Sequence, residues 1–94
     1  MNLEKAKKRI AKKVKMGFQG YPEISIAYLG CRKDLADEVV VTFVAEEGAD
    51  LMEEKFLSKT DARESEVIQS AIVKIIERSE AKTVKMSEEV GLKI

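Results

Sequence analysis

Residues 38–45, EVVVTFVA, decide the fold because they form the least ambiguous element of the sequence. The run is rich in β-branched and aromatic residues, which are enriched in β-strands. Side chains alternate along a strand, so Val39, Val41 and Phe43 would face one side of a sheet. The intervening positions are also mostly apolar. The sequence therefore predicts a strand that is apolar on both faces.

Two further strands are predicted, one on each side of this run. Residues 23–29, EISIAYL, alternate so that Ile24, Ile26 and Tyr28 share a face. Residues 51–58, LMEEKFLS, predict a third strand, and their charges are typical of a sheet edge or of a strand that is buried on one side only. Because short polar loops separate the three segments, we expect an antiparallel meander.

Residues 2–15, which precede the strands, have the periodicity of a helix. Asn2 has the side chain of an N-cap, and Gly17 stands where a left-handed residue commonly ends a helix. Phe18 is expected to fold back onto this helix as a hydrophobic cap. The apolar stripe of the helix consists of Leu3, Ala6, Ile10, Ala11 and Val14.

A second helix is predicted over residues 62–79, after the third strand. Asp61 and Glu64 stand three positions apart, in the manner of a capping box at its start. Its wide apolar face consists of Val67, Ile68, Ala71, Ile72, Ile75 and Ile76.

The last segment, residues 82–94, is expected to be either a flexible tail or a strand-forming one, with an extra strand or a hairpin. Its two alternating pieces are Val84/Met86 and Val90/Leu92/Ile94. The expected fold is thus one α+β domain spanning residues 1–94, with the order α-β-β-β-α. It would contain a three- to four-stranded antiparallel meander with both helices packed on one face.

The order of elements over residues 2–79 is similar to that of double-stranded-RNA-binding domains and of the ribosome-hibernation factors that share their architecture. The resemblance implies a fold and lies in element order alone. RNA-binding domains of that kind open the second helix with a cluster of lysines, whereas residues 60–66 here are TDARESE and are acidic. None of that family's sequence motifs is present, and element order does not carry function.

The composition excludes several classes of site. With no histidine and a single cysteine, Cys31, the chain cannot form an internal disulfide, a zinc-finger ligand set or a histidine-based catalytic triad. Its five glycines match no phosphate-binding loop. No apolar run has the length of a membrane span, and none follows the basic N-terminal residues as a signal peptide requires. We therefore expect a cytoplasmic, non-enzymatic protein that uses no cofactor, metal or membrane.

Charge is segregated along the chain although the net charge is zero. Residues 1–16 carry seven Lys or Arg against one Glu, a net of +6. Residues 34–66 carry eleven Asp or Glu against three Lys or Arg, a net of −8. Such a chain can fold its basic helix against its acidic loops, pair with a second copy, or present the basic helix to a polyanion.

The basic helix is the first candidate binding site, because Lys and Arg neutralise phosphates. The competing interpretation is a solvated helix whose apolar stripe packs on the sheet. Tyr21 could add base stacking to a polyanion site, or it could simply pack in the turn that contains Pro22. The candidate polyanion-binding residues are Lys5, Lys8, Arg9, Lys12, Lys13, Lys15 and Tyr21.

Two weaker candidates remain. Cys31 stands beside Arg32 and Lys33, which could favour a reactive thiolate, but the favoured interpretation is an incidental loop cysteine. The acidic pairs 46–47 and 53–54 match no calcium-loop spacing and are interpreted as solvated charges.

Two functions follow as expectations. The first is a self-associating interaction module, a homodimer or a partner of another protein. It is motivated by the two-sided apolar strand and by tail strands that could add to a neighbour's sheet. The alternative is an RNA- or ribosome-associated factor that uses the N-terminal helix.

Overall fold

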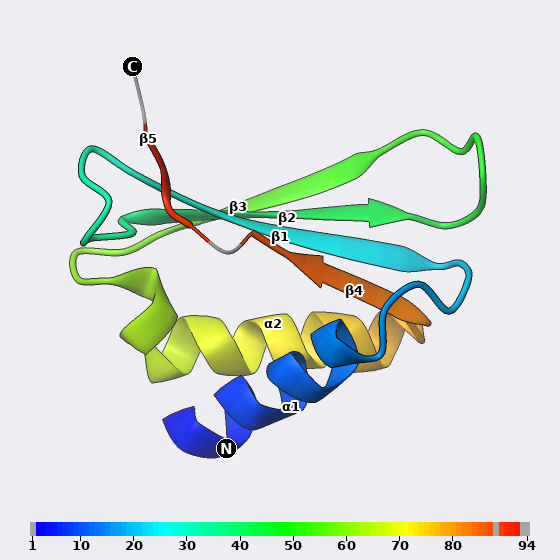
Figure 1. The fold of residues 1–94 in the computed structure, drawn as a ribbon, viewed down its shortest axis with the longest axis horizontal. Helices are drawn as coiled ribbons and strands as arrows, with labels where there is room; N and C mark the ends of the chain where they lie inside the picture. The colour runs from blue at the N-terminus through cyan, green and yellow to red at the C-terminus, as the bar shows by residue number, and fades with distance from the viewer. Residues whose placement is uncertain (1, 88, 93–94) are drawn as a thin grey trace.

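The computed structural model describes residues 2–87 and 89–92, and it has the α+β architecture expected from the sequence. Two helices pack on one side of a mixed sheet (Figure 1). The elements in chain order are α1 (Leu3–Lys15), β1 (Glu23–Gly30), β2 (Glu38–Val44), β3 (Met52–Leu57), a 3₁₀ turn η1 (Ala62–Glu64), α2 (Glu66–Ser79), β4 (Thr83–Met86) and β5 (Gly91–Leu92).

The first three strands form the expected antiparallel meander, in which Ile26 pairs with Val41 and Val41 pairs with Glu54. The rest of the sheet differs from the expectation, because β4 and β5 both lie parallel to β1. The strand order is β3-β2-β1-β4, and β5 continues along the edge of β1 beyond β4. The segment β3–α2–β4 is a crossover connection, which makes the strands it joins parallel. A meander of four strands and a C-terminal hairpin are therefore both wrong.

The tail belongs to the core of its own chain. Val84 in β4 is 1 % exposed and Thr83 is fully buried, while Val90, just before β5, is also buried. Of the two alternatives predicted for residues 82–94, the described part has the strand-forming one, since it contains β4 and β5. Ile94, the end of the second alternating piece, lies outside the described residues.

The ends of α1 are those that the sequence predicts. The Asn2 Oδ1 atom accepts a hydrogen bond of 2.8 Å from the Lys5 N–H, and Gly17 has a φ of 73°, which glycine adopts without strain. Phe18 departs from the expectation. Its side chain is 58 % exposed and makes an edge contact with the Tyr21 ring instead of packing back onto the helix.

The start and the buried face of α2 differ from the prediction. Asp61 caps η1, and the Ser65 hydroxyl accepts from the Ile68 N–H and caps α2 itself. Val67 is 80 % exposed, whereas Gln69 is buried. The buried face of α2 is Ile68, Gln69, Ile72, Val73 and Ile76, a set with steps of one, three, one and three. The buried face of α2 is therefore rotated away from Val67 and toward Val73, relative to the predicted apolar face. Hydropathy predicts that a polar residue such as Gln69 lies outside the buried face, but Gln69 lies within it.

The core lies between the helices and the inner face of the sheet. Ile10 of α1, Ile72 of α2 and Val84 of β4 are almost fully buried there. Its strand contributions are Ile24, Ile26, Tyr28, Val39 and Val41, which alternate as the sequence predicts. Figure 1 shows that neither helix covers the opposite face of the sheet. Val40 and Ala27, which alternate with the buried strand residues, are partly exposed.

Candidate functional site

Three cationic side chains of α1 are engaged within the fold. Lys7 Nζ lies 2.9 Å from Glu64 Oε1 in η1, and Arg9 Nη1 lies 3.0 Å from Glu77 Oε1 in α2. Lys13 Nζ donates to the Ala81 carbonyl at 3.5 Å. These pairs are largely exposed, so each adds little stability. They do assign two of the predicted binding residues, Arg9 and Lys13, to contacts within the chain.

The remaining lysines of the predicted site, which we call the lysine row, are Lys5, Lys8, Lys12 and Lys15. All four are exposed, and none forms an ion pair within the described residues. Steps of three, four and three residues place them on one face of the helix, opposite the buried Ala6. Ten residues of helix separate the first from the last, which is roughly 15 Å.

Tyr21 does not extend the lysine row through any contact in the described part of the chain. Its ring is half-buried and meets Phe18 with a centroid distance of 5.6 Å and an interplanar angle of 77°. Thr83 holds the loop between α1 and Tyr21 in place. Its Oγ1 accepts a hydrogen bond of 2.8 Å from the Gln19 N–H and donates one of 2.7 Å to the Gly20 carbonyl. The Phe18–Tyr21 pair therefore belongs to a loop after α1 that is hydrogen-bonded to Thr83.

A cavity of about 510 Å³ lies between α1, η1 and residues Ser87, Glu89 and Val90. At its wall the buried Tyr28 hydroxyl accepts a hydrogen bond of 2.9 Å from Gln69 Nε2, which also donates to the Ala62 carbonyl at 3.0 Å. Burial raises the pKa of Tyr28, so the hydroxyl stays protonated at neutral pH. This group therefore makes a polar contact inside the core. Sequence patterning missed Gln69, whose only signal was its position one step from Ile68.

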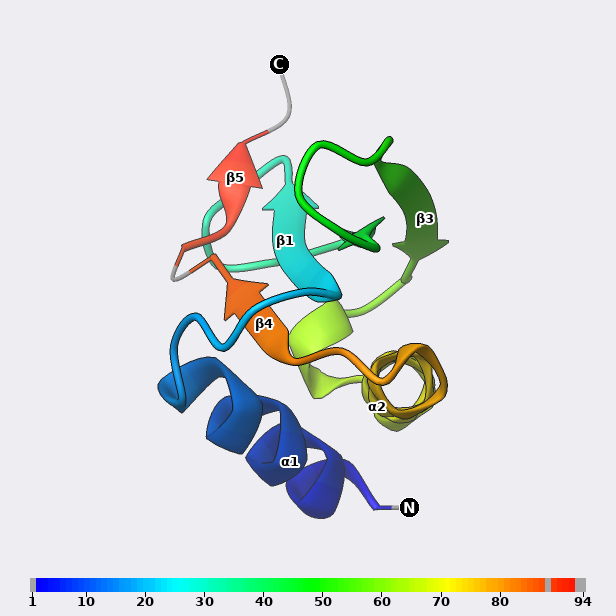
Figure 2. The same cartoon turned by 90° about the vertical axis from the view of Figure 1, so that its right-hand side faces the viewer.

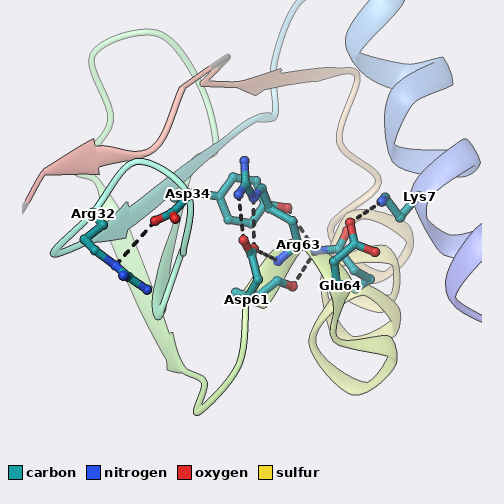
Figure 3. A network of polar contacts seen from close by, with 9 residues as sticks. Lys7, Arg32, Asp34, Asp61, Arg63 and Glu64 are labelled. Atoms are coloured by element: carbon teal, nitrogen blue, oxygen red, sulfur yellow. Dashed lines mark hydrogen bonds and ion pairs between the residues drawn. The ribbon is translucent and has the colours of Figure 1, made fainter.

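Arg63 and Asp61 form the tightest ion pair beside this cavity (Figure 3). Arg63 Nε and Nη2 lie 2.9 Å and 2.6 Å from the two carboxylate oxygens, and the Arg63 N–H also donates to Oδ1. The hydrogen bonds from the Arg63 guanidinium lower the pKa of Asp61 to about 2. The pair caps η1 and holds the β3–α2 connection, so we assign it a structural role.

The two weaker candidates gain nothing from the structure. Cys31 is exposed, and the neighbouring Arg32 guanidinium is shared with Asp34 at 3.4 Å. Over residues 2–87 and 89–92 no cluster of three or more carboxylate or thiol side chains is arranged to hold a metal ion.

The outer edge of β3 is an exposed surface. The charges of residues 51–58 are consistent with such an edge but do not predict which of its groups are unpaired. The Ser58 N–H donates to the Asp37 carbonyl at 2.9 Å and so continues the ladder between β3 and β2. Backbone groups alternate in direction along a strand, so those of Glu54 point toward β2. Those of Glu53 and Lys55 point away from it, and no other strand in the described chain pairs with them.

Large apolar side chains flank these free backbone groups. Leu51, Met52 and Leu57 are 68 %, 65 % and 76 % exposed. We call residues 51–57, with their outward backbone groups, the β3 edge. An unpaired strand with exposed apolar ends is a template for a further strand. Figure 2 shows β3 and α1 at opposite corners of the molecule, so the β3 edge and the lysine row are separate surfaces.

No protein-family model, curated protein or solved structure matches this chain. The resemblance to double-stranded-RNA-binding domains therefore remains one of element order. Neither helix in the described residues has the length and apolar composition required to cross a membrane. The function is argued below from the two exposed surfaces.

Proposed function

We propose that this chain is a non-enzymatic interaction module that self-associates through the β3 edge. The observation that carries the proposal is the free side of β3, where outward backbone groups lie between the exposed side chains of Leu51, Met52 and Leu57. Main-chain hydrogen bonds to such an edge give affinity, and the side chains beside them give specificity.

The tail is a poor candidate for the same role. Both β4 and β5 pair with the edge of β1 within their own chain, and they are short strands of four and two residues, whereas β3 offers six. Deleting residues 82–94 would remove the buried Val84 and damage the fold, and it is not a clean test of association.

Sedimentation equilibrium tests the proposal with one pair of variants. Wild-type protein is expected to reach the mass of a dimer at roughly 10–100 µM, the affinity range of a modest interface. Glu53→Pro should be a folded monomer, because proline removes an outward N–H with which no other strand pairs in the described part of the chain. The matched control Glu54→Pro should unfold, because that N–H belongs to the ladder with β2.

The outcomes separate clearly. A monomeric wild-type protein at every accessible concentration would refute self-association. A dimer that persists in folded Glu53→Pro would place the interface elsewhere, on the open sheet face or on α1.

A second candidate function is binding of RNA or the ribosome, and the lysine row favours it. Four ammonium groups that form no ion pair within the described residues lie on one face of α1, where they can neutralise successive phosphates and release counterions. Lysine binds as a hydrated point charge, so this surface would recognise a polyanion without reading its sequence.

Retention on heparin and co-sedimentation with ribosomes test this candidate. Lys8→Gln combined with Lys12→Gln should weaken both, and the wild-type interaction should fall steeply with salt. Lys33→Gln with Lys59→Gln is the matched control, since it removes the same charge from exposed loop positions outside α1. Equal losses in the two variants, or no binding by wild-type protein at low salt, would remove this function.

A further inference from the structure

We propose that the β3 edge pairs with the β3 edge of a second copy, antiparallel and in one register, with Glu54 on the two-fold axis. This inference rests on the self-association proposed above and specifies its geometry. The partner is identical to this chain, and the two sheets join into one continuous sheet.

The sequence of the edge is complementary to itself in only one register. In an antiparallel pair centred on Glu54, Glu53 lies opposite Lys55 of the other copy, and the two-fold axis repeats that pair. The same register sets Met52 opposite Phe56 and Leu51 opposite Leu57, so apolar side chains also meet apolar side chains. A centre at Lys55 would place Lys55 opposite Lys55 of the other copy, and Glu54 opposite Phe56. A centre at Glu53 would place Glu53 opposite Glu53 of the other copy, and Glu54 opposite Met52.

The backbone of the edge agrees with this register. A centre at Glu54 makes that position a non-hydrogen-bonded pair, because its N–H and C=O point toward β2. Glu53 of one copy and Lys55 of the other then form the hydrogen-bonded pairs. The N–H and C=O groups of these two residues are the ones that point away from β2. Each copy thus directs its unpaired donors and acceptors at those of the other.

The charges on the edge explain why a second copy fits better than an arbitrary strand. Glu53 and Lys55 of one chain already lie on one face of β3, 3.8 Å apart. Two copies in this register bring two carboxylates and two ammonium groups together in alternation. A strand without the reversed charge pattern would leave at least one of these charges facing a neutral or like-charged group.

One repulsive contact is built into the arrangement. Glu54 meets Glu54 of the other copy across the axis, and directly opposed like charges destabilise a strand pair. We expect Glu54→Gln to lower the dissociation constant several-fold. Phe56 flanks this position on the same face of the sheet, where it packs against the core.

Charge reversal tests the register. Glu53→Lys and Lys55→Glu each place like charges opposite one another twice, so each should raise the dissociation constant roughly ten-fold. The double variant Glu53→Lys/Lys55→Glu restores opposite charges at both positions and should recover wild-type association. Sedimentation equilibrium measures all four proteins. A double variant as weak as the single variants would overturn the register.

A cysteine cross-link provides a second test that does not depend on charge. In a Cys31→Ser background, Glu54→Cys should form a disulfide-linked dimer under mild oxidation. Non-hydrogen-bonded pairs bring Cα atoms to roughly 4.5 Å, which is within disulfide range. Met52→Cys is the control on the same face of β3, because its two copies would lie about four residues apart along the strands and should cross-link far more slowly.

Failure of this inference is distinguishable from failure of the proposed function. A dimer that is sensitive to Glu53→Pro but shows neither charge rescue nor the Glu54→Cys cross-link would keep the β3 edge as the interface and refute the two-fold register. Self-association that is absent altogether would refute both. Binding of a different protein to the edge of a monomeric chain would replace the second copy with another partner and contradict the inference.

Discussion

At the residue scale, the polar contacts inside the core are what the sequence pattern could not foresee. Alternation in residues 23–29 predicted that Tyr28 faces inward, and the structure confirms it. Nothing in hydropathy indicates that Gln69 is buried with it, because glutamine becomes favourable there only once the Tyr28 hydroxyl and the Ala62 carbonyl are in place. Such pairings depend on three-dimensional proximity between segments far apart in the sequence.

Replacing Gln69 with Leu should destabilise the protein by about 1–3 kcal/mol, because it leaves a buried hydroxyl and a buried carbonyl without their partner. Adding Tyr28→Phe should recover part of that loss, since the orphaned hydroxyl is then removed as well. Urea unfolding of the two single variants and the double variant measures the coupling. Additive losses in the double variant would show that the two side chains do not interact.

The Asp61–Arg63 pair predicts a dependence of stability on acid. The folded-state pKa of Asp61 is about 2, below the ordinary value of 3.8. Its stabilisation is therefore fully present above about pH 4 and is lost as the pH falls toward 2, up to about 2 kcal/mol. Urea unfolding between pH 6 and pH 2 should show a shallower acid loss for Asp61→Asn than for wild type. Parallel pH curves for the two proteins would contradict the assignment.

At the element scale, local patterns predicted each helix and strand better than their ends and partners. Asn2 and Gly17 bound α1 as expected because capping is a local interaction. The start of α2 was misplaced, since Asp61 and Ser65 are both capping residues and only the turn between them shows which one opens the helix. The pairing of β4 with β1 was also missed, because four residues of alternation do not specify a partner strand.

The assignment of faces on α1 has a direct test. Ile10→Asp should cost several kcal/mol, about 3 or more, because it places a carboxylate in the core where Ile10 is 2 % exposed. Lys8→Gln together with Lys12→Gln should change stability by less than about 1 kcal/mol, as expected for exposed side chains. Thermal unfolding of both variants gives the comparison. Unfolding by the lysine changes and tolerance of Ile10→Asp would reverse the assignment.

At the scale of the whole molecule, the charged side chains divide between ion pairs within the fold and the two exposed surfaces on which the proposals rest. The basic helix gives Lys7 and Arg9 to ion pairs with Glu64 and Glu77, so part of the charge asymmetry joins α1 to α2. The lysine row and the β3 edge are left at opposite corners (Figure 2). A dimer through β3 would leave both lysine rows exposed, so the two proposed interactions are compatible.

The candidate site was predictable only in part. Composition identifies α1 as the basic element. Separating Lys5, Lys8, Lys12 and Lys15 from the other cations of α1 requires the positions of Glu64 and Glu77, which pair with Lys7 and Arg9. The charges of residues 51–58 predicted a sheet edge. They could not predict that the tail would pair with β1, on the side of the sheet opposite β3, since that follows from the crossover through α2.

Residue-resolved amide hydrogen exchange, at concentrations below and well above the dissociation constant, tests the self-association through β3 most directly. We predict that the amides of Glu53 and Lys55 become protected as the concentration rises, because each gains a hydrogen bond to the second copy. Those of Glu54 and Phe56 should stay protected at every concentration, since they already bond to β2. Fast exchange at Glu53 and Lys55 at all concentrations, or protection that grows on α1 instead, would contradict the account.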